Sequence, residues 1–208
     1  MKKFTLAFCI LTLGSSTVYA TKNAESPVGD AATGKTKSAL CAACHGADGN
    51  SVNPLWPSLA GQHAKYTVQQ LNNFQSEARK EQTMSPMAAP LSPQDMLDLA
   101  AYFESQTPKI GDAIEKSLKL GQKVYRGGNK ETGVSACIAC HGPKGKGNPA
   151  AKYPAIAGQH GKYALKQLQD YKSGARKAEG NAVMMRDIAL KMSDAEMKAV
   201  TDYVQGLY

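Results

Sequence analysis

The chain has 208 residues, five cysteines and a formal net charge of +8 at neutral pH. A basic start, an apolar run and a small-residue pattern ending at Ala20 predict a cleaved export signal over residues 1–20, and hence a periplasmic protein. The apolar run is too short for a membrane anchor, and Cys9 lacks the small residue that precedes a lipoprotein cysteine. Export also argues against nucleic acid as the partner of the basic charge.

The positive charge is concentrated in the second half of the chain. Without the signal, 23 basic and 17 acidic side chains leave a net charge of +6. Residues 21–110 contribute −1 (7 basic, 8 acidic), and residues 111–208 contribute +7 (16 basic, 9 acidic). Such polarity would steer docking toward an acidic partner or hold the protein peripherally at an anionic membrane surface, and both interpretations stay open.

The first half is predicted to be helical, with no useful strand. Asp30 can cap a helix that runs into a Cys-x-x-Cys-His motif at 41–45. A loop rich in glycine, proline and asparagine follows over 46–61, and residues 64–76 have apolar positions at helical spacing. Ser92, followed by proline, predicts the start of a closing helix.

The second half repeats this order and indicates a duplicated domain. The Cys-x-x-Cys-His motif recurs at 137–141, an offset of 96 (137 − 41). Leu-Ala-Gly-Gln-His at 59–63 recurs as Ile-Ala-Gly-Gln-His at 156–160, an offset of 97 (156 − 59). A matching helix is expected over 161–173, and Ser193 begins a capping box for the closing helix.

The joint between the copies falls near Gln106–Asp112, where a threonine, a proline and a glycine break helical continuation. We therefore predict an N-terminal domain over 21–108 and a C-terminal domain over 109–208. Each domain contains one complete copy of the motif and its following helices.

The two motifs have the spacing of covalent haem attachment. Two thiols three residues apart can reach the vinyl groups along one haem edge, and the adjacent histidine then lies under the iron. A zinc site needs four ligands, and a thioredoxin-like site expects a βαβ context; neither matches two short motifs in a helical repeat. The predicted attachment residues are Cys41, Cys44, Cys137 and Cys140, and the predicted proximal iron ligands are His45 and His141.

The sixth iron ligand separates an electron carrier from an enzyme, because methionine fills the site and an open position permits chemistry with small molecules. Met84 and Met185 both lie eight residues before the serine that starts each closing helix, so they are the predicted axial ligands. Met87 and Met184 have no methionine counterpart in the other copy and remain runners-up.

Two further residue pairs correspond between the copies. His63 and His160 could complete the iron as second histidines, or could lie at the surface or beside haem propionates. Pro57 and Pro154 follow the proximal histidines by 12 and 13 residues, so their carbonyls could accept the imidazole N–H; a proline that only stiffens the loop is the alternative.

The sequence resembles the cytochrome c4 family, dihaem cytochromes made of two class I cytochrome c domains. The likeness covers essentially the whole mature chain and rests on residues 41–50, 59–62, 84, 90–92, 125–128, 185–186 and 203–207. The resemblance implies two haem c groups with histidine and methionine on both irons, carbonyl bonds from Pro57 and Pro154, and two domains around an approximate two-fold axis. It also implies electron delivery to a terminal oxidase, often of the cbb3 type.

We therefore expect an all-α fold of two tandem class I cytochrome c domains related by an approximate two-fold. The expected function is periplasmic transfer of single electrons by a monomer, between a cytochrome bc1-type donor and a cbb3-type oxidase. No set of catalytic acids, bases or nucleophiles is evident. The competing classes are a dihaem peroxidase or small-molecule oxidoreductase with one open or histidine-ligated iron, and a subunit of an oxidase complex.

Overall fold

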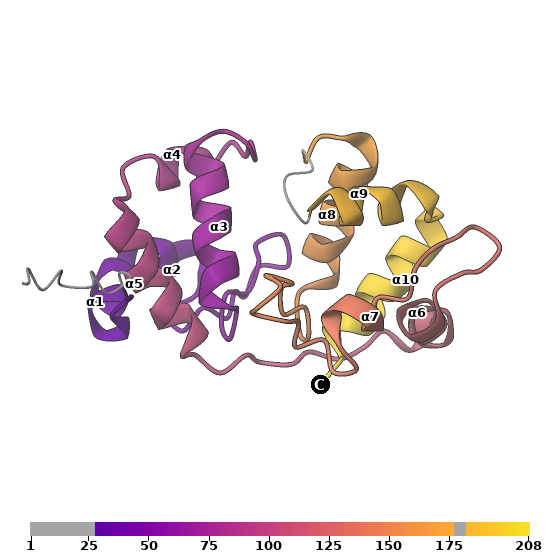
Figure 1. Ribbon diagram of the computed structural model, residues 1–208. Helices are drawn as coiled ribbons and strands as arrows, with labels where there is room; N and C mark the ends of the chain where they lie inside the picture. The colour runs from indigo at the N-terminus through magenta and orange to yellow at the C-terminus, as the bar shows by residue number, and fades with distance from the viewer. Residues whose placement is uncertain (1–27, 177–181) are drawn as a thin grey trace, which may run out of the picture.

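The computed structural model describes residues 28–176 and 182–208, and the predicted export signal over 1–20 and Cys9 lie outside them. The described chain forms two helical lobes joined by a linker along one side (Figure 1). The first lobe contains α1 (Ala31–Lys37), α2 (Ala39–His45), α3 (Ala64–Gln75), α4 (Met84–Ala88) and α5 (Pro93–Glu104). The second contains α6 (Glu115–Gly127), α7 (Ile138–His141), α8 (Gly161–Ser173), α9 (Ala182–Lys191) and α10 (Asp194–Gln205).

The sequence signals for helix starts are confirmed at the closing helices. Ser92 and Ser193 each cap their helix; both form a capping box, which the sequence predicted at Ser193. The helix expected from Asp30 into the first motif is instead two segments that meet at Ser38. The Ser38 hydroxyl donates to the Lys35 carbonyl (2.8 Å). In a continuous helix this carbonyl would accept the backbone N–H four residues later, so the side chain gives the break a local cause.

Each lobe is built around the crossing of its first and last helices. α1 packs on α5, and α6 packs on α10. A Cβ at Gly34 would lie 2.0 Å from the Asp98 carbonyl oxygen, and one at Gly121 would lie 2.2 Å from the Ala199 carbonyl oxygen. Only glycine allows the backbones to approach so closely, and the two crossings are therefore equivalent parts of the duplicated domain.

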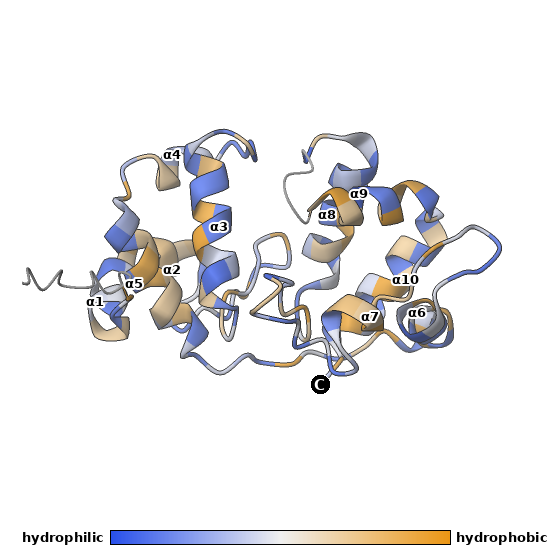
Figure 2. Cartoon of the chain, viewed as in Figure 1, coloured by the Kyte–Doolittle hydropathy of each residue, from blue (hydrophilic) through white to orange (hydrophobic). Residues whose placement is uncertain are grey.

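The hydrophobic cores lie inside these crossings, and Figure 2 shows hydrophobic residues along α5 in the first lobe and α7 in the second. Tyr102 and Tyr125 are buried in the two cores, and their hydroxyls donate to Ala47 O and Gly142 O, both at 2.6 Å. Each bond fixes the loop that follows a Cys-x-x-Cys-His motif. The second core consists of Val124, Tyr125, Val134, Met192, Met197, Val200, Tyr203, Val204 and Leu207.

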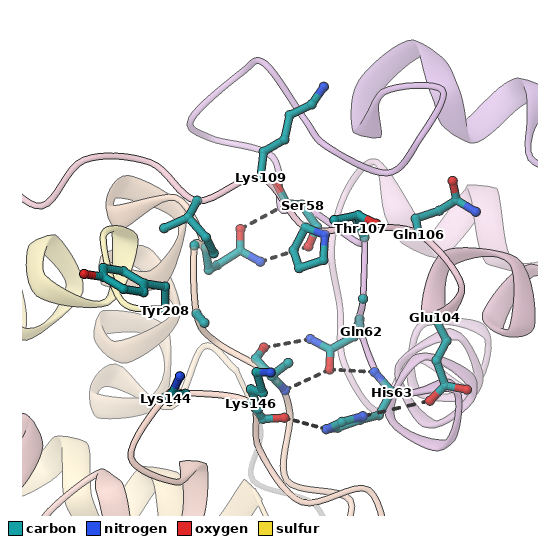
Figure 3. A pocket seen from close by; sticks show the side chains of 18 residues that line it. Ser58, Gln62, His63, Glu104, Gln106, Thr107, Lys109, Lys144, Lys146 and Tyr208 are labelled. Carbon is teal, nitrogen blue, oxygen red and sulfur yellow. Dashed lines mark hydrogen bonds and ion pairs between the residues drawn. The ribbon is translucent and has the colours of Figure 1, made fainter.

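The two lobes face each other through α3 and α8 and through the loops after the motifs (Figures 1 and 3). Equivalent residues of the two domains make reciprocal contacts there, as an approximate two-fold requires. Among the described residues, extended pairing is limited to the isolated bridges Asn129–Val134 and Asn148–Tyr153. None of the helices described has both the length and the apolar character to cross a bilayer.

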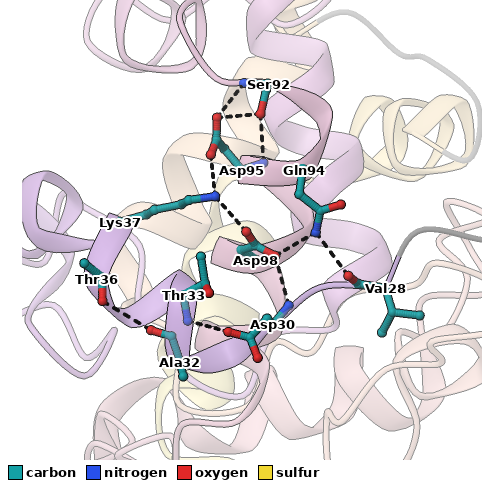
Figure 4. A network of polar contacts seen from close by, with 10 residues as sticks. All are labelled: Val28, Asp30, Ala32, Thr33, Thr36, Lys37, Ser92, Gln94, Asp95 and Asp98. Carbon is teal, nitrogen blue, oxygen red and sulfur yellow. Dashed lines mark hydrogen bonds and ion pairs between the residues drawn. The ribbon is translucent and has the colours of Figure 1, made fainter.

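A buried carboxylate fastens α1 to α5 in the first lobe (Figure 4). Asp98 accepts bonds from Asp30 N (2.9 Å), Lys37 Nζ (2.7 Å) and Gln94 Nε2 (2.8 Å). The bond from the Asp30 backbone, helped by Lys37, holds the pKa of Asp98 at about 2. Lys37 also contacts Asp95 (2.6 Å), so this crossing is held by charge as well as by packing.

Candidate functional site

The motif histidines have the same environment in both domains. His45 lies at the end of α2 with Nδ1 2.8 Å from Pro57 O, and His141 lies at the end of α7 with Nδ1 3.0 Å from Pro154 O. A carbonyl only accepts, so Nδ1 carries the hydrogen and Nε2 keeps the lone pair that a metal requires. The two loop prolines, whose role spacing left open and the family resemblance implied, thus have their carbonyls at hydrogen-bond distance from both rings.

Burial supports the same protonation state. His45 and His141 are 6% and 7% exposed, and this burial lowers the pKa of each ring, while the carbonyl bond acts in the opposite direction. Both rings are therefore neutral at neutral pH, which is the form that binds iron.

The four motif cysteines are free and half-buried. Burial raises the pKa of the Cys137 thiol to about 11 and also raises the pKa of Cys41. A redox-exchange cysteine has a lowered pKa, so these two thiols do not resemble one. Free thiols three residues apart, beside a neutral histidine with an available nitrogen, fit covalent haem.

The described methionines fall into two groups: those buried in the hydrophobic cores, and those on α4 and α9, which are half-buried or exposed. Met84 begins α4, Met185 lies in the first half of α9, and both are half-buried. Met87 is also half-buried, whereas Met184 is 39% exposed with its sulfur 3.9 Å from the Tyr153 hydroxyl. The methionines that fill the hydrophobic cores are Met96, Met192 and Met197.

A pair of glutamines joins the two domains (Figure 3). Gln62 Nε2 donates to Ala155 O (2.9 Å), and its Oε1 accepts from Ala155 N (3.0 Å). Gln159 Nε2 donates to Ser58 O (2.9 Å), and its Oε1 accepts from Ser58 N (3.0 Å). The repeated Gly-Gln-His sequence is therefore an interdomain clasp, in which each copy binds the loop of the other.

The neighbouring histidines extend this clasp. His63 Nε2 lies 2.7 Å from Lys146 O, and His160 Nε2 lies 2.8 Å from Ser51 O. In both cases the carbonyl belongs to the other domain. This arrangement argues against iron ligation by His63 or His160, because Nε2 of each ring is used across the interface.

Two arginines, one after α3 and one after α8, form a second set of contacts across the interface. Arg79 and Arg176 are 9% and 7% exposed, and each lies over an aromatic ring of its own domain. Among the described residues, neither guanidinium forms an ion pair with a carboxylate. Their hydrogen-bond partners are neutral side chains from both domains: Gln70, Gln167, Tyr66 and Tyr163. Such a buried cationic pair is suited to groups that carry carboxylates, as haem does.

A cavity of about 520 Å³ lies at the base of the interface, between the clasp and the linker (Figure 3). Its lining includes Gln62, His63, Lys144 and Lys146. None of the motif cysteines or histidines lines it, so it is separate from the two candidate metal centres.

Comparison with known proteins identifies the family. A model of the cytochrome c family matches residues 31–107 and again 118–208. Cytochrome c4 from Azotobacter vinelandii is 43% identical over 189 residues, 86% of this chain and 90% of the relative. Cytochrome c4 from Thiocapsa roseopersicina is 46% identical over 182 residues, 86% and 94% of the two chains. The chain belongs to the cytochrome c4 family.

The fold agrees with this assignment. The crystal structure of reduced recombinant cytochrome c4 from Pseudomonas stutzeri matches with a TM-score of 0.84 and 42% identity, covering 87% of this chain and 100% of that chain. The predicted architecture of two tandem cytochrome c domains is confirmed. As in the cytochrome c4 family, the protein carries two haem c groups and functions in electron transfer.

The sequence predicted two domains related by an approximate two-fold, but it did not identify the residues that join them. Gln62 and Gln159 were visible as part of a repeated motif, and that repetition was the signal that each had a shared task. Arg79 and Arg176 also correspond at an offset of 97 (176 − 79), but nothing in the sequence indicates that they would meet across a domain boundary.

Proposed function

We propose that the protein is a periplasmic carrier that passes single electrons from the respiratory chain to a terminal oxidase. The observation that carries this proposal is the duplicated histidine geometry: both domains hold a neutral, buried imidazole with Nδ1 on a proline carbonyl. Two equivalent sites favour transfer through both domains over a division into one electron-transfer site and one catalytic site.

In this proposal each cysteine pair attaches one haem, and bound haem supplies a one-electron iron couple. His45 and Met84 complete the first site, and His141 and Met185 complete the second. The carbonyls of the two loop prolines fix the imidazole tautomer and raise its basicity as a ligand. A methionine sulfur favours the reduced iron and leaves no open position for a substrate.

The interface supports passage of electrons between the domains. Arg79 and Arg176 place two positive charges in a poorly solvated region between the lobes. Positive charge there stabilises an added electron in either domain, because the reduced site is less positive than the oxidised one. The clasp of Gln62 and Gln159 holds the two sites at a fixed separation.

The partners we propose are a cytochrome bc1-type donor and a cbb3-type oxidase acceptor, as the family resemblance implies. The domain limits of 21–108 and 109–208 are likewise our proposal, supported by the family matches that end at 107 and begin at 118. We propose that the protein acts as a monomer.

Reductive titration of the haem-loaded protein tests the proposal. We expect two electrons per chain, one for each cytochrome c domain, with low-spin iron before and after reduction. Hydrogen peroxide added to the fully oxidised protein should leave its spectrum unchanged, because both axial positions are expected to be filled. High-spin iron in one domain, together with peroxide turnover, would contradict the carrier function and favour a dihaem peroxidase.

A further inference from the structure

α6 carries a row of positive charge on its solvent face. Lys116, Lys119, Lys123 and Arg126 follow one another at spacings of three, four and three residues, which places them on one side of the helix. All four are exposed, and the buried residues of α6 lie on the opposite side, against α10. At 1.5 Å per residue the row spans roughly 15 Å. We call these four residues the α6 stripe.

The α6 stripe is not neutralised by its surroundings. Within the described part of the chain, none of its side chains makes an ion pair or a hydrogen bond, and Lys123 influences Glu196 only at longer range. Lysines on other helices behave differently: Lys37, Lys166 and Lys198 each contact an aspartate. Glu115 lies one turn before Lys119 but forms no ion pair with it among the described residues, so this face of α6 is mainly positive rather than a network of exposed ion pairs.

The duplicated domain provides an internal control. The crossing glycines Gly34 and Gly121 align α1 with α6 at an offset of 87 (121 − 34). The same offset takes the stripe to four uncharged residues of the first domain, Gly29, Ala32, Thr36 and Ala39, of which Ala32 and Thr36 lie within α1. The fold does not need the cations, since the first domain packs the same helix crossing without them.

The surroundings of the stripe fit a transient protein contact. Leu118 and Leu120, on either side of it, are 37% and 39% exposed. Charges that attract at a distance, together with a small apolar rim, match weak electron-transfer complexes, whose interfaces are small.

The position of α6 also fits electron exchange. α6 lies beside α7, which carries His141, and at the end of the molecule away from the first lobe (Figure 1). A partner seated on α6 would therefore lie on the second domain and away from the first.

We propose that the α6 stripe is the docking surface for a carboxylate-rich patch on an electron-exchange partner protein, and that this partner exchanges electrons with the second domain. The inference rests on the proposed function, because it assumes that the second motif holds a redox-active haem. The partner's chemistry follows from charge complementarity. Complementary fields raise association rates by 10–10³-fold at low ionic strength, and salt removes the effect.

The test measures binding of an octaglutamate peptide to the haem-loaded full-length protein at low ionic strength. One variant replaces Lys116, Lys119, Lys123 and Arg126 with glutamine. A matched control replaces four exposed lysines elsewhere with glutamine, which gives the same change of net charge: Lys35, Lys65, Lys80 and Lys162. We expect the stripe variant to bind about tenfold more weakly, from four exposed charge contacts, and the control to bind as the unaltered protein does.

Two outcomes would overturn the proposal. Equal losses in the stripe and control variants would mean that only net charge matters. Stripe-dependent binding to phosphatidylglycerol vesicles without stripe-dependent binding of octaglutamate would assign the surface to a membrane. The absorption spectrum and reductive titration of the same samples report the haems separately, so a failure of the proposed function would be recognised independently of the peptide result.

Discussion

Removal of the glutamine clasp should uncouple the two domains. Gln159→Ala eliminates two bonds to Ser58 of the first domain and one to the backbone N–H of His160. Gln62→Ala eliminates the equivalent two bonds to Ala155 and one to His63 N. With a net contribution of about 1 kcal/mol per bond, each substitution should destabilise the protein by about 2–3 kcal/mol, water replacing part of the loss.

The distinctive expectation concerns cooperativity. Four of the six bonds join the domains, so the double variant should lose about 4 kcal/mol of coupling between them. Thermal unfolding of the haem-loaded protein, followed by calorimetry, should then separate into two transitions. Gln75→Ala is the matched control, because Gln75 Nε2 lies within hydrogen-bond distance of three carbonyls, all within the first domain. A double variant that still melts in one transition near the original temperature would refute the clasp.

Three further substitutions test the fold. Glu77 adopts φ +57° where the second domain has Gly174, so Glu77→Gly should raise the unfolding free energy by about 1 kcal/mol, measured in urea. Gly121→Ala should destabilise the second domain by about 3 kcal/mol or more, because its Cβ would meet Ala199 O at 2.2 Å; thermal melting checks this. The pKa of Asp98 is lowered to about 2, so the carboxylate stabilises the fold fully above pH ~4, and this stabilisation is lost as the pH falls toward 2. In Asp98→Asn the free energy of unfolding, measured in urea, should therefore change less with pH over that range.

Much of the fold could be predicted because its signals are local. The serine caps at 92 and 193 define helix starts within four residues of sequence, and the structure has both. The two Cys-x-x-Cys-His motifs and their repeat were enough to indicate two equivalent domains. Spacing alone left the role of Pro57 and Pro154 open, and the family resemblance favoured the carbonyl bonds to the histidines that the structure has.

The remaining features depend on long-range geometry. Gln62 binds Ala155 and Arg79 binds Gln167, partners 93 and 88 residues away that are set only when the lobes dock. The break at Ser38 depends on a single hydrogen bond from its hydroxyl to the Lys35 carbonyl, and helix propensity does not predict that bond. That the residues of the α6 stripe form no ion pairs could not be predicted from the sequence. Counting charges over 111–208 does not show which lysines pair with aspartates, as Lys166 and Lys198 do.

The most direct test of the account is the sulfur-to-iron charge-transfer band of the oxidised protein. If both irons have histidine and methionine ligands, the band has the intensity of two haems, and Met84→Ala and Met185→Ala each remove half of it. Met87→Ala and Met184→Ala serve as controls and should leave it unchanged. A band that survives either of the first two substitutions, or one that is lost with Met87 or Met184, would contradict the ligand assignment on which the carrier function depends.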